Sequence, residues 1–97
     1  MYLSIQNQLM LLHDLLDEQI TYKKVNINEY KQIKKLVQAI ITNRHVNAEL
    51  LTVLPEIYYY GMKGENAQSS LNHIIENEHK IRKWLNLINR VNLHRSS

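Results

Sequence analysis

The chain contains no cysteine. This absence excludes a disulfide framework, a zinc finger and catalysis by a thiol, and it fits a reducing cytoplasm. Glycine and proline are scarce, at two residues and one, which favours helices over a turn-rich sheet. No apolar run approaches the roughly 18 residues of a membrane span, and the N-terminus lacks the basic start and apolar core of a signal peptide. We therefore expect a soluble cytoplasmic protein.

What is present is the composition of one folded domain, covering residues 1–97, with 44% hydrophobic and 22% charged residues. The charge is unevenly distributed. Residues 1–22 carry three acidic residues and no lysine or arginine, whereas residues 23–48 carry six basic residues and one acidic residue. Neighbouring helices of opposite charge attract one another weakly. We interpret the alternation as complementarity within the chain rather than as a binding surface.

Four segments have apolar residues at the three- and four-residue spacing of an amphipathic helix. Residues that commonly cap helices precede them, and the second opens with the capping-box spacing of Asn26 and Glu29. Lys31, Lys34 and Lys35 fall on the solvent side of that second helix. We expect helices over residues 4–19, 26–44, 47–61 and 70–91. Short connections between four helices predict an all-α fold, an antiparallel up-and-down bundle.

The third segment contains the single proline, Pro55. A proline inside a helix removes a backbone donor and clashes with the preceding turn, so we predict that the third helix is kinked or split there. Gly61 is a natural C-terminal stop. Tyr58, Tyr59 and Tyr60 step round the helix at about 100° each, which places Tyr59 outward, on the side of Pro55.

The last segment holds the longest apolar stripe of the chain, and the other helices are expected to pack against it. Neither glycine nor proline interrupts it. The stripe consists of Leu71, Ile74, Ile75, Ile81, Trp84, Leu85, Ile88 and Val91.

These elements together resemble the YtzH-like family of Bacillus and its relatives, and the likeness covers nearly the whole chain. It implies a small cytoplasmic protein of that bacterial group and implies no activity. The residues that carry it are Gln8-Leu9, the run Leu36-Val37-Gln38-Ala39-Ile40-Ile41-Thr42-Asn43, Val53-Leu54, Ile57-Tyr58-Tyr59-Tyr60, His73-Ile74 and Trp84.

Metal binding is the first chemistry to consider. Glu76 and His79 form a Glu-x-x-His unit, and His13 and Asp17 lie one turn apart. A ferritin-like site needs the Glu-x-x-His unit twice, with two further inward carboxylates, and the sequence has one copy. Glu76 and His79 fall on the solvent side of the last helix, and His13 is expected to bond to Asp17. The sequence leaves open whether His13, Asp17, His73, Glu76 or His79 binds a metal. We predict neither metal nor cofactor, and a metal-binding helical-bundle enzyme is the alternative.

No nucleophile motif, phosphate-binding loop or dinucleotide fingerprint is present. Glu78 falls on the apolar side of the last helix, between Ile74 and Ile81. It is either a buried carboxylate with a raised pKa or a residue paired with a nearby lysine or arginine. We predict no catalytic residue and no small-molecule substrate, and therefore a protein that is not an enzyme.

Two further alternatives are a nucleic-acid-binding protein and a bundle like the bacteriocin immunity proteins. The turn near Arg44 invites a helix-turn-helix interpretation, but the outward face of the third helix carries Glu49 and Glu56 and no arginine, and would repel phosphate. Immunity proteins match in size and charge, but no specific motif supports them.

The surplus of apolar side chains favours a non-enzymatic module that acts through protein contacts, including a homodimer. Met10 and Leu11 lie off the main apolar line of the first helix, and Trp84 and Val91 lie at the flank of the last. The candidate interface residues are Met10, Leu11, Tyr59, Trp84 and Val91.

Overall fold

The computed structural model describes residues 4–95, with the side chains of residues 4–91, and shows helices and no strand in that range. The helices are α1 (Ile5–Tyr22), α2 (Ile27–Ile41), α3 (Ala48–Glu65) and α4 (Ser70–Arg95). The prediction of an all-α chain of four helices is confirmed. None of these helices is both long enough and apolar enough to cross a membrane, as far as the described residues extend.

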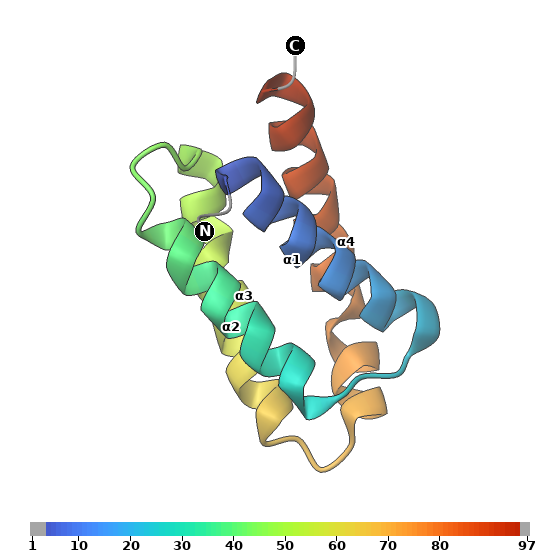
Figure 1. The fold of residues 1–97 in the computed structure, drawn as a ribbon. Coiled ribbons are helices and arrows are strands. Elements are labelled where there is room, and N and C mark those ends of the chain that lie inside the picture. Colours follow the sequence, from blue (N-terminus) through green and yellow to red (C-terminus); the bar gives the residue numbers. More distant parts are fainter. Residues whose placement is uncertain (1–3, 96–97) are drawn as a thin grey trace.

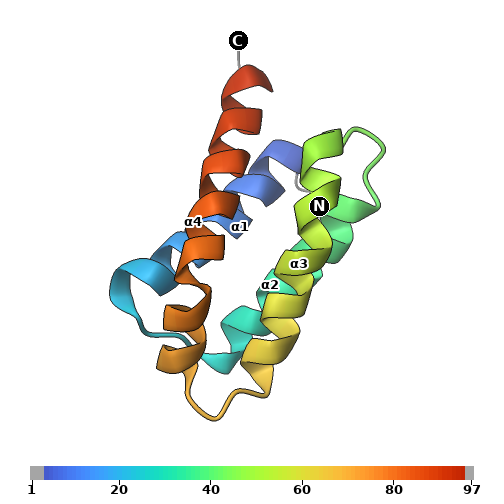
Figure 2. The ribbon, with the colours of Figure 1, turned by 180° about the vertical axis from the view of Figure 1, so that it is seen from behind.

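The helices are arranged as a ring in which each packs against two others. α1 contacts α2 and α4, and α3 contacts the same two helices. Figures 1 and 2 show α2 and α3 side by side, with α1 lying beside α4 and the C-terminal end of α4 projecting beyond the other helices. The antiparallel up-and-down course of the bundle stays a prediction.

The beginnings of the helices follow the capping residues seen in the sequence. The side chains of Ser4, Asn26 and Asn47 each accept a backbone N–H from the first turn of α1, α2 and α3. Asn26 also forms the predicted capping box with Glu29. These short-range hydrogen bonds fix where each helix starts, because they satisfy N–H groups that have no partner within the helix.

One hydrophobic core fills the centre of the ring, and all four helices contribute to it. Its fully buried members include the largest side chain of the chain, Trp84, with Tyr30 and the aliphatic residues Leu9, Leu12, Leu16, Ile33, Ile40, Leu50, Leu54, Ile57, Ile74 and Ile81.

α3 is longer than predicted. It runs without a break through Pro55 and past Gly61, so a split at Pro55 and a stop at Gly61 are both wrong; the kink at Pro55 stays a prediction. The glycines serve close packing instead. A Cβ atom on Gly64 would lie 2.5 Å from Cδ1 of Tyr30, and one on Gly61 would lie 3.0 Å from Cγ of Lys34. α3 can approach α2 closely because these two positions have no side chain.

The buried stripe of α4 differs from the prediction at its edges. Leu71 and Ile75 lie on one flank of the line through Ile74 and Ile81, and both are exposed. Trp84 lies on the other flank and is buried. At about 100° per residue the two flanks look equally apolar in the sequence. Only the packing of α4 in the ring decides which flank faces the core.

Candidate functional site

The surface between α1 and α2 contains a shallow apolar groove of about 340 Å³. Leu11 and Leu15 from α1 line one wall, and Leu36 of α2 lines the other, with Gln32 and Lys35 beside it. Leu15 and Leu36 are half-buried and rest on the core, whereas Leu11 is 44% exposed. Leu11 and Leu15 are four residues apart, so they lie one above the other on the same face of α1. We call this feature the α1–α2 groove.

Three of the five candidate interface residues are accessible. Met10 and Tyr59 are 56% and 53% exposed, and Leu11 lines the α1–α2 groove. Tyr59 points outward from α3 as predicted, and the ammonium of Lys63 lies 5.2 Å from the centre of its ring.

The other two candidates, Trp84 and Val91, are 1% and 5% exposed, so the prediction that they form an exposed apolar flank is wrong. The physical reason is packing within the chain. The Trp84 indole meets the Tyr60 ring edge-on, with 5.7 Å between the ring centres, and its Nε1 donates to Oε1 of Glu56 at 3.4 Å. These contacts bring α3 and α4 together around Trp84. The accessible apolar interface candidates that lie near a groove are therefore on α1.

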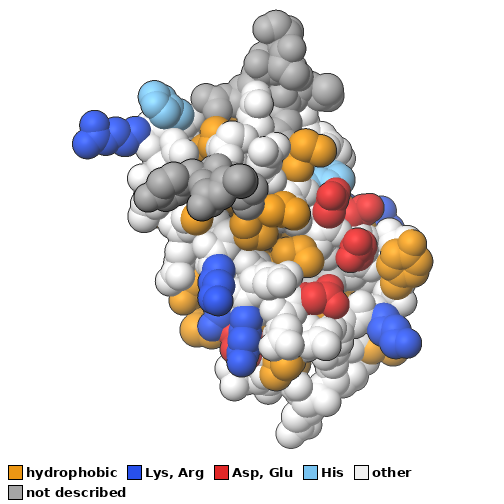
Figure 3. Space-filling view, in the orientation of Figure 1, with side chains coloured by type: hydrophobic (Ala, Val, Ile, Leu, Met, Phe, Trp, Pro, Cys, Tyr) orange, Lys and Arg blue, Asp and Glu red, His pale blue; other side chains and the backbone are white. Residues whose placement is uncertain are grey.

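Charged side chains of opposite sign border the α1–α2 groove. Figure 3 shows acidic side chains gathered over α1 on one side of a central apolar patch, and basic side chains over α2 on the other. Asp14 and Glu18 are exposed on α1, one turn apart. Lys31 and Lys35 are exposed on α2 with the same spacing. We call these pairs the acidic row and the basic row.

A second hollow, of about 250 Å³, lies between α3 and α4, and some of its polar groups pair with one another. His73 Nε2 donates to the backbone carbonyl of Tyr60 at 3.0 Å, and the two rings are stacked with centres 4.6 Å apart. The Asn77 amide donates to the backbone carbonyl of His73 at 2.8 Å. The histidine is thereby held in place as a packing residue between two helices.

The residues considered as possible metal ligands do not form a metal site in the described part of the chain. Glu76 and His79 are both exposed, as expected. His13 approaches Oδ1 of Asp14 at 3.4 Å, so the expected bond to Asp17 is wrong. Among the described residues no group of three or more histidine or acidic side chains could hold a metal ion.

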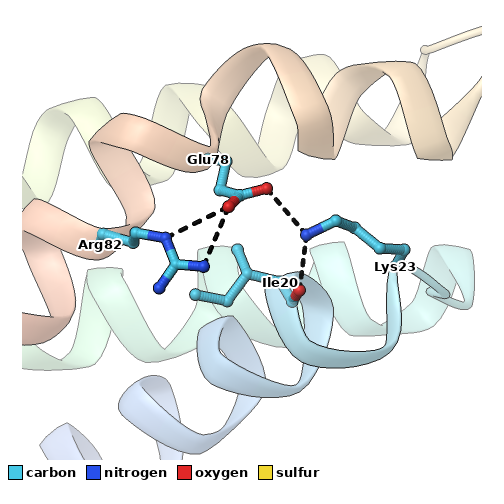
Figure 4. A network of polar contacts seen from close by, with 4 residues as sticks. All are labelled: Ile20, Lys23, Glu78 and Arg82. Carbon is cyan, nitrogen blue, oxygen red and sulfur yellow. Dashed lines mark hydrogen bonds and ion pairs between the residues drawn. The ribbon is translucent and has the colours of Figure 1, made fainter.

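The carboxylate of Glu78 forms the best-defined polar network of the chain (Figure 4). Nζ of Lys23 donates to Oε1 of Glu78 at 2.8 Å and to the backbone carbonyl of Ile20 at 2.7 Å. Nε and Nη2 of Arg82 donate to Oε2 at 3.2 and 3.0 Å. The hydrogen bond from Lys23, followed by that from Arg82, lowers the pKa of Glu78. The prediction of pairing is confirmed, and the alternative of a raised pKa is wrong.

Lys23 ends α1 in the left-handed region, with φ of 54°. A non-glycine residue adopts this backbone at some energetic cost, and it is common as the last turn of a helix closes. The backbone N–H of Lys23 donates to the carbonyl of Gln19, which closes that turn. The network therefore ties the C-terminal end of α1 to α4. Sequence reasoning missed Lys23 because its partner is 55 positions away.

Two further residues absent from the sequence prediction hold α3 to α1 and to α2 through their side chains. Gln19 of α1 is fully buried, and its Oε1 accepts a hydrogen bond from the Tyr60 hydroxyl at 2.5 Å. Burial raises the pKa of that hydroxyl, so it remains protonated and able to donate. Glu65 forms an ion pair with Lys34, which is half-buried against α3 and not in solvent as predicted.

Comparison with known proteins agrees with the resemblance seen in the sequence. A protein of Bacillus subtilis (strain 168), the uncharacterized protein YtzH, is 25% identical to this chain over 85 residues, which is 88% of this chain and 92% of the relative. No solved structure matches the chain. The model of the YtzH-like protein family matches residues 3–88. The chain therefore belongs to the YtzH-like family.

Proposed function

We propose that this chain is a non-enzymatic interaction module of the cytoplasm that acts through protein contacts and associates with a second copy of itself. The observation that carries the proposal is the α1–α2 groove, in which the exposed Leu11 stands beside the half-buried Leu15 and Leu36. An apolar groove rimmed by polar side chains is typical of protein interaction sites. Met10, next to Leu11 on the same helix, adds flexible apolar surface of the kind that adapts to a partner.

The interactions of the polar side chains favour this proposal over an enzyme. His73 and Glu78 are the titratable residues that most nearly fit a site, and each is engaged in holding helices together. A general acid or base needs to reach a substrate proton, and these hydrogen bonds are made to the chain itself.

The proposal includes the arrangement of the helices, an antiparallel up-and-down bundle of a single domain with a bend at Pro55. Support comes from the ring of contacts, in which each helix packs against its neighbours in sequence and α1 against α4. In such a bundle the outer surface of α1 remains available to a partner.

Sedimentation equilibrium at micromolar concentrations tests the proposed function. We expect the wild type to be a dimer and Leu11→Glu to be a folded monomer, because the variant places a charge in the centre of the apolar contact. Leu51→Glu is the matched control, since Leu51 is an equally exposed leucine on α3, outside the residues that line the groove. A wild type that remains monomeric throughout the concentration range contradicts the proposal.

A further inference from the structure

The acidic row and the basic row lie on opposite sides of the α1–α2 groove and have the same spacing. Asp14 and Glu18 are four residues apart on α1, and Lys31 and Lys35 are four residues apart on α2. Residues four apart on a helix have Cβ atoms about 6 Å apart on the same face. Each row is therefore a pair of like charges of the same length as the other, and all four side chains are exposed.

Among the described residues, three of the four side chains in the two rows form no ion pair. The ion pairs that link different helices join Lys23 to Glu78, Lys34 to Glu65 and Arg90 to Glu49, as far as the described side chains extend. Of the ion pairs between described residues, Asp14 in the acidic row forms one, with the adjacent His13 at 3.4 Å. Within the same residues, Glu18, Lys31 and Lys35 form no ion pair. The charge alternation predicted to be satisfied within the chain is thus left open at the groove.

A surface with an apolar centre, an acidic edge and a basic edge is complementary to itself. A two-fold axis that lies in the contact plane and runs along the groove exchanges the two edges. The acidic row of each copy then faces the basic row of the other, and the leucines of both grooves meet in the centre. Such an isologous contact forms both sets of ion pairs at once and closes the assembly at two copies.

Resting on the proposed function, we infer that the partner of the α1–α2 groove is a second copy docked about this axis, with α1 of each copy over α2 of the other. The leucines provide the affinity, because exposed ion pairs contribute little to it. The rows determine the orientation, because a dimer whose two-fold axis runs across the groove instead of along it places like charges opposite one another.

Charge exchange tests this inference. One variant reverses the acidic row (Asp14→Lys with Glu18→Lys), and a second reverses the basic row (Lys31→Glu with Lys35→Glu). In each homodimer all facing rows carry the same sign, so we expect the dissociation constant from sedimentation equilibrium to rise at least roughly tenfold. In an equimolar mixture of the two variants every facing pair is again opposite, so a heterodimer of near wild-type affinity is expected. Raising the salt concentration should weaken the wild-type dimer and strengthen each reversed homodimer.

The matched control is Lys80→Glu with Lys83→Glu, which changes the net charge as much as the basic-row variant does, through two exposed lysines of α4. It should leave the dissociation constant unchanged. Circular dichroism checks that all three variants remain helical. A wild-type dimer that the reversals do not weaken, or a mixture that does not regain affinity, overturns the inferred orientation and leaves the proposed function standing. A monomeric wild type overturns both.

Discussion

Helix α2 has two neighbours, and it meets them in different ways. On the side of α3 the backbones approach closely, because Gly64 leaves room for the Tyr30 ring and Ile33 fills the contact. On the side of α1 the contact stays open at the surface, and Leu36 lines a groove. The contact of α2 with α3 is therefore filled by side chains of the chain itself, whereas its contact with α1 leaves apolar surface exposed.

This difference shows where the chain still has apolar contacts to make. A filled contact has lost its exposed apolar surface to folding, whereas a groove keeps such surface in water until a partner covers it. α1 shows the same asymmetry, since the Lys23–Glu78–Arg82 network ties it to α4 while its other edge lines the groove.

The largest expected effect is a loss of stability from Ile33→Ala. Ile33 is fully buried, and its Cγ2 lies 3.5 Å from where a Cβ on Gly61 would stand, so truncation leaves a cavity in the filled contact. We expect the free energy of unfolding to fall by roughly 2–5 kcal/mol. Leu36→Ala, on the groove side of the same helix, should cost about 1 kcal/mol or less in the monomer. Urea unfolding at low protein concentration measures both, and equal losses would mean that the two sides of α2 do not differ.

The next effect concerns the glycines of α3. In Gly64→Ala the new methyl group overlaps the buried Tyr30 ring, and such overpacking lowers the free energy of unfolding by about 1–3 kcal/mol. The higher helix propensity of alanine offsets up to about 1 kcal/mol of this loss. Gly61→Ala is the control, because its methyl group meets the flexible Lys34 side chain at 3.0 Å and the Tyr30 carbonyl at 3.2 Å. Thermal unfolding should show a lower midpoint for Gly64→Ala than for Gly61→Ala. The reverse order would contradict the inference that α3 approaches α2 too closely at Gly64 to admit a side chain.

A smaller effect depends on pH and tests the α1–α4 side. The pKa of Glu78 is lowered in the folded chain, chiefly by the hydrogen bond from Lys23, so the folded state binds its proton less readily than the unfolded state. The stability that this carboxylate contributes is complete above its ordinary pKa of 4.5 and is lost as the pH falls through the lowered value.

Glu78→Gln should therefore lose less stability than the wild type between pH 6 and pH 3, as measured by urea unfolding at a series of pH values. Glu76→Gln, at an exposed position of the same helix, should follow the wild type. A Glu78→Gln curve parallel to that of the wild type would show that the network does not tie α1 to α4.

The smallest effect is expected at Pro55, an exposed residue inside α3. Pro55→Ala restores a backbone donor and should be neutral or slightly stabilising. A strong loss of stability in thermal unfolding would instead indicate that a bend at Pro55 is built into the fold.

The features that the sequence predicted are local. Helix starts depend on a capping side chain and the N–H groups two or three residues later, so Ser4, Asn26 and Asn47 could be identified directly. The outward positions of Tyr59, Met10 and Leu11 followed from the helical repeat in the same way.

The features that the sequence did not predict depend on contacts between distant segments. Gly61 has the same local signature whether it ends a helix or admits a neighbouring one, and only the position of α2 distinguishes the two. The helical repeat places Trp84 and Leu71 on opposite flanks of the apolar stripe of α4 and does not show which flank is buried. The packing of α3 against Trp84 decides it. The groove itself arises from the distance between α1 and α2, which no pattern within either helix records.

The central claim is that a second copy covers the α1–α2 groove, and methyl NMR of the wild type at increasing concentration tests it most directly. We expect the methyl resonances of Leu11, Leu15 and Leu36 to shift together as the dimer forms. Those of Leu71 and Ile75, which are exposed on α4, should remain in place. Groove resonances that do not move while those of α4 do, or a spectrum that is independent of concentration for a chain that sediments as a monomer, would contradict it.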